Sequence, residues 1–222
     1  MTTVNEVVDF WLDEVGPERW YAADDALDQE VRGRFEHRWW NTLNGANGLW
    51  LTYATGTLAY IILMDQMPRN MFRGTARSFG SDRHARAAAK AALHNGWDLK
   101  IDEPARQFFY MPLMHSESLT DQDRAVRLIT SRLPQGKNLQ LPHAQAHRDI
   151  IRKFGRFPAR NAALNRRTTE PEVTYTQAGG YDFTLRSFAA SSQSVDAVTT
   201  DRVKGTDEIS ICTGLNYSLT LN

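Results

Sequence analysis

The chain has 222 residues, of which 41% are hydrophobic, and its 26 Lys and Arg balance its 26 Asp and Glu. This length suits one domain with at most an appendage, and it buries enough surface to need no cross-links. The zero net charge does not indicate a nucleic-acid or membrane partner, and the single cysteine, Cys212, excludes an internal disulfide and a cysteine-based zinc cluster.

The N-terminal residues 1–16 are acidic and lack the basic start and continuous apolar run of a signal peptide. We therefore predict a cytoplasmic protein. The strictly apolar run Leu58 to Met64 has seven residues, whereas a helix needs about 20 to cross a bilayer. A buried core helix is predicted there, and no membrane span is expected.

The predicted elements of residues 1–180 are all helices. Val4, Val7, Val8, Trp11 and Leu12 follow the helical spacing and predict a helix over 3–14, which Gly16-Pro17 ends. A second helix begins after Asp24, a good N-cap residue, and runs to about residue 39. A third covers 55–67, with a boundary or kink before Pro68.

An alanine-rich helix follows Ser81 or Asp82 and ends before Gly96. The next begins at Glu103-Pro104 and has Pro112 near its end. Three further helices are predicted over 125–133, over 142–154 and after 169. The first and the last of them follow capping boxes, Thr120 with Asp123 and Thr169 with Glu172.

Seven or eight helices joined by short turns indicate an all-α fold of antiparallel helix pairs. From Ser187 to Asn222 the chain is rich in serine and threonine and has no helical stripe. This tail is predicted to be either irregular or to form short strands over 207–212 and 216–221.

Polar residues of interest gather in three blocks. These are DQMPRN at Asp65 to Asn70, YMPLMHSE at Tyr110 to Glu117, and FGRFPARN at Phe154 to Asn161. With these blocks in this order, the chain resembles the bacterial DUF924 family of unknown function over about residues 6 to 183. The resemblance implies a tetratricopeptide-like superhelical fold for residues 1–183 and leaves 184–222 as an extension. It also leads us to expect histidine at position 159 and glycine at position 165, where this chain has Ala159 and Asn165.

One hypothesis is a binding module whose polar groove holds a peptide or a small anionic ligand. Arginine can hold a carboxylate or a phosphate through two parallel hydrogen bonds. The candidate ligand-binding residues come from all three blocks and their flanks. They are Asp65, Gln66, Arg69, Asn70, Arg106, His147, Arg156, Arg160 and Asn161.

The alternative is a small-molecule hydrolase or lyase. His115 would act as the base, Glu117 would orient it, and Tyr110 is the third catalytic candidate, while arginines hold an anion. Structural roles stay open beside both hypotheses, because Asp–Arg pairs commonly tie helices together and a tyrosine is more often part of the core. A purely structural interaction through an apolar surface also stays open.

No metal and no cofactor are expected. His115, Glu117, His143 and His147 are donors, but they form no zinc motif. The run from Arg152 to Arg167 has six basic residues and no acid. We interpret it as a face that meets the acidic N-terminal helices, so no nucleic-acid partner is expected. The sequence leaves the oligomeric state open.

Overall fold

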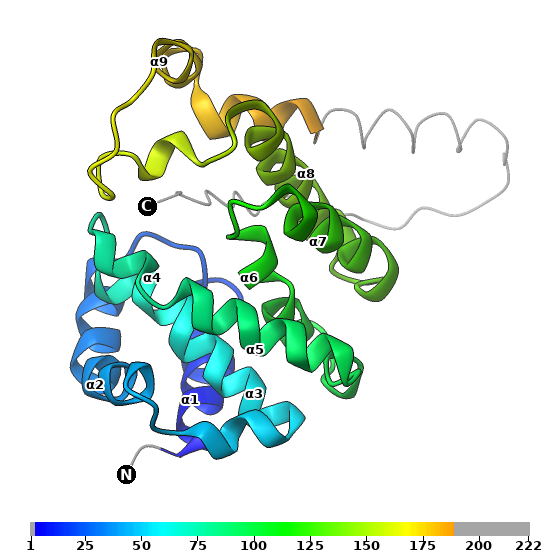
Figure 1. Ribbon diagram of the computed structural model, residues 1–222. Coiled ribbons are helices and arrows are strands. Elements are labelled where there is room, and N and C mark those ends of the chain that lie inside the picture. The colour runs from blue at the N-terminus through cyan, green and yellow to red at the C-terminus, as the bar shows by residue number, and fades with distance from the viewer. Residues whose placement is uncertain (1–2, 189–222) are drawn as a thin grey trace, which may run out of the picture.

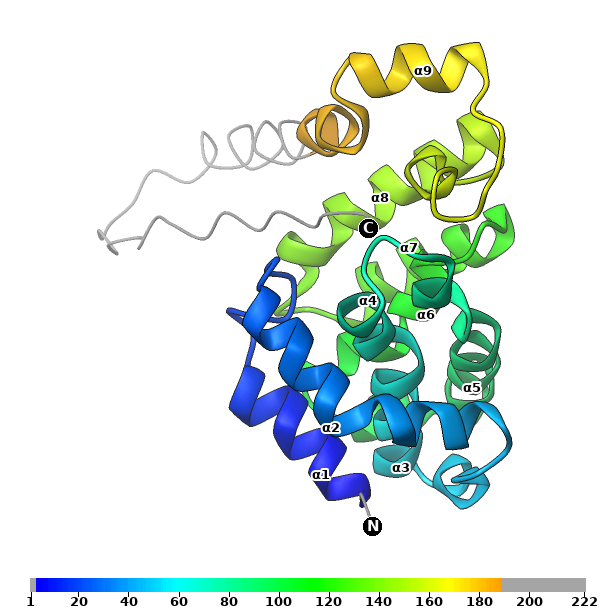
Figure 2. The same ribbon diagram turned by 90° about the vertical axis from the view of Figure 1, so that its left-hand side faces the viewer.

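The computed structural model describes residues 3–188, and over this range the chain is helical and has no strand (Figures 1 and 2). The first five α-helices are α1 (Val4–Asp9), α2 (Asp25–Leu43), α3 (Ala54–Ile61), α4 (Met67–Met71) and α5 (Asp82–His94). They are followed by α6 (Met111–Met114), α7 (Leu119–Arg132), α8 (Lys137–Phe154) and α9 (Glu170–Gln177). Residues 180–188 are also helical.

Shorter helical segments connect or extend these helices. Two are wider π-helical turns, Phe10–Val15 after α1 and Ile62–Gln66 between α3 and α4. The others are tighter 3₁₀ turns: Gly48–Thr52, Ala76–Phe79, Asp98–Lys100, Ala105–Phe109 and Pro158–Arg160.

The helices form a large body and a smaller end. In both views α9 and α1 lie at opposite ends of the molecule, and α8 packs beside α7 and leads toward α9 (Figures 1 and 2). Aromatic side chains fill the core of the large body, among them Trp11, Phe35 and Phe108. A second, small core of Ile150, Ile151 and Phe157 holds the end that carries α9. The all-α fold is thus confirmed, whereas the tetratricopeptide-like array and the boundary at 183 stay predictions.

Several predicted helix ends are confirmed by their local geometry. Asp24 accepts hydrogen bonds from the amides of Ala26 and Leu27 and caps α2. Gly16 and Gly155 follow helices with φ of 70° and 69°, a region that glycine enters without a Cβ penalty. The Thr169–Glu172 capping box opens α9.

Other expectations are corrected. The helix predicted over 142–154 begins at Lys137, because Pro142 near its start removes only one hydrogen bond of an early turn. Pro112 lies in the first turn of α6 rather than near a helix end. The capping box of Thr120 and Asp123 does not form, since α7 already begins at Leu119.

The boundary or kink predicted before Pro68 is present, because the helix changes type before the proline and α4 then runs from Met67 to Met71. The π-helical turn Ile62–Gln66 precedes the proline, and Pro68 lies in the first turn of α4. A π turn inserts an extra residue into the helix and often lies at a functional site. Here it carries Asp65 and Gln66, two of the candidate residues.

The possible strands over 207–212 and 216–221 fall outside the described residues. Within residues 3–188, no helix is long and apolar enough to cross a bilayer.

Candidate functional site

A polar pocket lies where the three sequence blocks meet. We call it the polar pocket; its volume is about 80 Å³. The first block contributes side chains from the π turn and α4, the second from α6 and the residue after it, and the third from the turn Pro158–Arg160. His147 on α8 lies seven residues before the third block. The lining residues are Trp20, Tyr21, Ala22, Gln66, Arg69, Asn70, Arg73, Phe79, Met111, Met114, His115, His147 and Arg160.

Asp65 lies directly behind this lining and holds His115. The carboxylate is fully buried, and its two oxygens lie 2.9 and 3.0 Å from His115 Nδ1. Gln66 donates a further hydrogen bond to the same carboxylate. Burial favours the neutral acid, but the charge and hydrogen bond of His115, together with the charge of Arg69, lower the pKa of Asp65 below its ordinary value. Asp65 is therefore an ionised acceptor.

This pair determines which nitrogen of His115 carries the hydrogen. A carboxylate only accepts hydrogen bonds, so Nδ1 carries the hydrogen. In the neutral ring Nε2 is then the basic nitrogen, and within residues 3–188 no hydrogen bond reaches it. Because His115 lines the polar pocket, this nitrogen is placed to accept a proton there.

Two arginines of the lining, Arg69 and Arg160, share one carboxylate, Asp82, which lies outside the lining. Arg69 donates to Asp82 at 2.8 Å and to the carbonyl of Ser78. Arg160 is only 7% exposed, and its contact with Asp82 is long at 3.5 Å. The guanidinium carbons of Arg69 and Arg160 lie 4.8 and 4.6 Å from the ring centroid of Phe79.

Arg160 is the less compensated of these two cations. Its Nε has no hydrogen-bond partner within the described part of the chain. Burial, then the charge of Arg69, lower the pKa of Arg160 to about 10, so it remains charged at neutral pH. Arg160 is thus a buried cation whose contacting carboxylate also pairs with Arg69, although the charges of Asp82, Glu117 and Asp65 offset part of its own.

Other polar residues of the lining are either bonded to a neighbouring carboxylate or uncharged. Arg73 makes two hydrogen bonds to Asp28, at 2.6 and 2.8 Å, and Asn70 donates to the same carboxylate. His147 is buried between the rings of Phe157 and Tyr181. Burial holds the pKa of His147 well below its ordinary value, so its ring is uncharged.

Glu117 does not orient His115, which corrects the role predicted for it. Its oxygens accept from Arg166 at 2.7 and 3.0 Å and from the amide of Phe157. These bonds fasten the turn after α8 to the segment after α6. Asp65, fifty residues away from His115 in the chain, occupies the position expected for Glu117.

Four other candidates lie outside the pocket lining and bind the scaffold. Tyr110 is fully buried and donates to Asp98 at 2.8 Å. Arg106 donates to the carbonyls of Ile101 and Arg132. Arg156 and Asn161 both bind Glu172 at the start of α9.

The sequence analysis did not select Asp82, Phe79, Arg73, Trp20 or Tyr21 as site residues. Asp82 was visible only as a possible helix cap, although it starts α5 beside Arg69. Arg73 lies three residues after the end of the first block, and this nearness was the signal available for it. Trp20 and Tyr21 enter from the loop before α2, which no motif marks.

The two positions that depart from the expected family pattern lie outside the pocket lining. Ala159 is exposed, so the absent histidine removes no side chain from the pocket wall. Asn165 has φ of 51°, a left-handed conformation that glycine adopts most readily. This backbone conformation explains why glycine is expected at position 165.

The part of the chain described, residues 3–188, brings no three histidine, cysteine or acidic side chains together in a cluster suited to a metal ion. The fold and the pocket define an all-helical protein with a polar pocket built from three distant segments.

The family model for the bacterial protein of unknown function DUF924 matches residues 7–180, and the chain belongs to this family. A solved structure of a protein of unknown function from Agrobacterium tumefaciens is similar, with 40% sequence identity and a TM-score of 0.73. The match covers 78% of this chain and 96% of that one. None of the curated proteins compared with the chain matches it.

Proposed function

We propose that the polar pocket binds a small anionic ligand through Arg160 and Arg69. The observation that carries this proposal is the charge of Arg160, which is almost fully buried and has only a long contact to the one carboxylate that Arg69 also uses. No acidic side chain is among the lining residues. A carboxylate or phosphate group fits this wall, because it would accept charge-assisted hydrogen bonds from the guanidinium groups.

Binding of inorganic phosphate and of acetate, measured by isothermal titration calorimetry, tests the proposal. Arg160→Met removes the cation but leaves Asp82 paired with Arg69, and it should weaken binding of either anion by about 10-fold or more. Arg152→Met is the matched control, since Arg152 is an exposed arginine outside the lining. It should leave the dissociation constants within about twofold of wild type. Equal binding by wild type and Arg160→Met would refute the proposal.

A hydrolase acting on such an anion is the second candidate, favoured by the Asp65–His115 pair. Nε2 of His115 would take a proton from water as the water oxygen attacks a carbonyl carbon of the bound molecule. The bond to the leaving group then breaks, and His115 returns the proton to that group. Asp65 would keep Nδ1 protonated throughout.

Turnover and binding can be separated with one variant. His115→Asn keeps the guanidinium groups in place, so it should abolish hydrolysis of small p-nitrophenyl esters that carry a carboxylate while acetate still binds. A variant that hydrolyses these esters as fast as wild type would remove the catalytic role, and the binding proposal would stand.

A further inference from the structure

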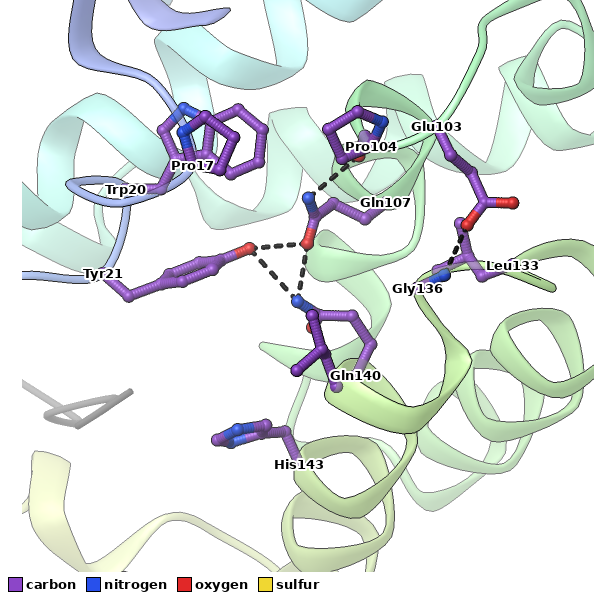
Figure 3. A pocket seen from close by; sticks show the side chains of 11 residues that line it. Pro17, Trp20, Tyr21, Glu103, Pro104, Gln107, Leu133, Gly136, Gln140 and His143 are labelled. Atoms are coloured by element: carbon purple, nitrogen blue, oxygen red, sulfur yellow. Dashed lines mark hydrogen bonds between the residues drawn. The ribbon is translucent and has the colours of Figure 1, made fainter. Parts of the chain in front are cut away.

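A second pocket lies beside the polar pocket (Figure 3). We call it the side pocket; its volume is about 110 Å³. Its wall is mainly apolar carbon and neutral amide groups, and the side chains drawn in Figure 3 surround one hollow. The lining residues are Pro17, Trp20, Tyr21, Glu103, Pro104, Gln107, Leu133, Gly136, Leu139, Gln140 and His143.

The two pockets are neighbours with shared walls. Trp20 and Tyr21 line both. The hydroxyl of Tyr21 contacts Gln107 Oε1 at 2.7 Å on the side-pocket wall and Met111 Sδ at 3.5 Å on the polar-pocket wall. His143 and His147 line one pocket each and are one turn apart on α8, a separation of about 6 Å along the helix axis.

The side pocket has hydrogen-bonding groups, and its one carboxylate, Glu103, is held by backbone amides. Gln140 Nε2 donates to Gln107 Oε1 at 2.6 Å, and Glu103 turns to the backbone amide of Gly136 at 2.7 Å (Figure 3). His143 Nδ1 lies 2.5 Å from the Tyr181 hydroxyl, and burial lowers the pKa of His143 to about 4. The lining offers no cation to a second anionic group, which would lose its hydration without gaining a partner, so an uncharged group suits it better.

We infer that the ligand is an organic anion with an uncharged, carbon-rich arm. The anionic end would lie against Arg160 in the polar pocket, and the arm would reach past Tyr21 into the side pocket. This inference rests on the proposed function. An apolar cavity of about 150 Å³ holds benzene in another protein, so a pocket of about 110 Å³ that opens to solvent accepts an arm no larger than an amino-acid side chain.

Matched pairs of probes test the inference by calorimetry. Acetate is compared with 3-phenylpropanoate, and inorganic phosphate with phenyl phosphate, so that the arm is tested on both kinds of anion. Burial of the ring should tighten binding by about 10-fold or more in at least one pair. 3-Phenylpropanol, which has the arm without the charge, should bind at least about 10-fold more weakly than 3-phenylpropanoate.

Leu139→Trp places a larger side chain at the side pocket. Leu139 is 57% exposed, so the change spares the core. The variant should lose the gain from the arm but retain wild-type binding of acetate and phosphate. Leu99→Trp is the matched control, because Leu99 is 54% exposed and lies outside both pocket linings. It should keep the gain.

The outcomes separate the two proposals. If acetate or phosphate binds through Arg160 and the arm adds nothing, the inference is wrong and the proposed function stands. If the phenyl probes bind equally well to Arg160→Met, the side pocket is a separate site and the inference also fails. If no anion binds to the wild type, both fail. A nuclear Overhauser contact between the ligand ring and Leu133, which lines only the side pocket, gives an independent check that needs no folded Leu139 variant.

Discussion

Asp65 and His115 meet through both carboxylate oxygens of Asp65, although fifty residues separate them in the chain. Asp65 comes from the π turn between α3 and α4, and His115 directly follows α6. The pair connects two of the three polar blocks inside the protein. It also leaves Nε2 as the second ring nitrogen of His115, a residue that lines the polar pocket.

Asp65→Asn should reverse the tautomer of His115. An asparagine that keeps its oxygen on Gln66 presents its amide to Nδ1, which must then accept, and Nε2 takes the hydrogen. Nitrogen-15 NMR of the histidine side chains reads this directly. The free energy of unfolding should fall by about 1–3 kcal/mol, because buried hydrogen bonds to a charged group are lost.

Asp123→Asn is the control for this change, since Asp123 is exposed and lies 3.7 Å from Arg148. Its effect on unfolding should stay within about 0.5 kcal/mol. A hydrogen that remains on Nδ1 in Asp65→Asn would show that the backbone or solvent, rather than Asp65, sets the tautomer.

Tyr110→Phe should affect stability and leave anion binding unchanged. The Tyr110 hydroxyl donates to Asp98, which also accepts from Arg132. Burial, then the hydrogen bond to Asp98, raise the pKa of Tyr110 far above its ordinary value, so the hydroxyl stays a donor. Its loss should lower the free energy of unfolding in urea by about 1–3 kcal/mol. A weaker affinity for phosphate in this variant would instead link Tyr110 to the polar pocket.

Stability should decline as the pH falls from about 6.5 toward 4. Burial lowers the pKa of His143 to about 4 and the pKa of His147 well below its ordinary value. In this interval the unfolded chain binds protons that the folded protein refuses, so each histidine contributes up to about 1.4 kcal/mol per pH unit to the decline. Urea unfolding at a series of pH values measures the slope.

His143→Gln should reduce that slope by up to about 1.4 kcal/mol per pH unit, the contribution of one proton. The exposed His94→Gln should leave the slope unchanged. An identical slope in wild type and His143→Gln would mean that His143 protonates equally well in the folded state.

Asn165→Gly should be more stable than Asn165→Ala by about 1 kcal/mol. The backbone at this position has φ of 51°, where a Cβ atom is disfavoured. Gln29 lies exposed in the interior of α2 and serves as the opposite case, because alanine is favoured over glycine inside a helix by about 1 kcal/mol. Thermal unfolding of the glycine and alanine variants should show glycine as the more stable at position 165 and alanine as the more stable at the helical position. The same order at both positions would contradict a left-handed conformation at 165.

Features that depend on nearby residues could be predicted from the sequence. The cap at Asp24, the helix stop at Gly155 and the box of Thr169 with Glu172 each involve groups within a few residues. The three polar blocks also indicated Gln66, Arg69, His115 and Arg160, and the segment just before the third block indicated His147; these residues line one pocket. A short block with many polar residues is therefore a useful indication of a site, and it depends only on residues that are close together in the chain.

The partners of those side chains could not be predicted in this way. His115 binds Asp65 rather than the nearby Glu117, and Tyr110, one turn before His115, points into a separate buried network. Which side chains meet depends on the extra residue of the π turn before α4 and on how α4, α6 and α8 pack. These are long-range relationships, since a small rotation of one helix moves a side chain to another face. Only the folded arrangement decides them.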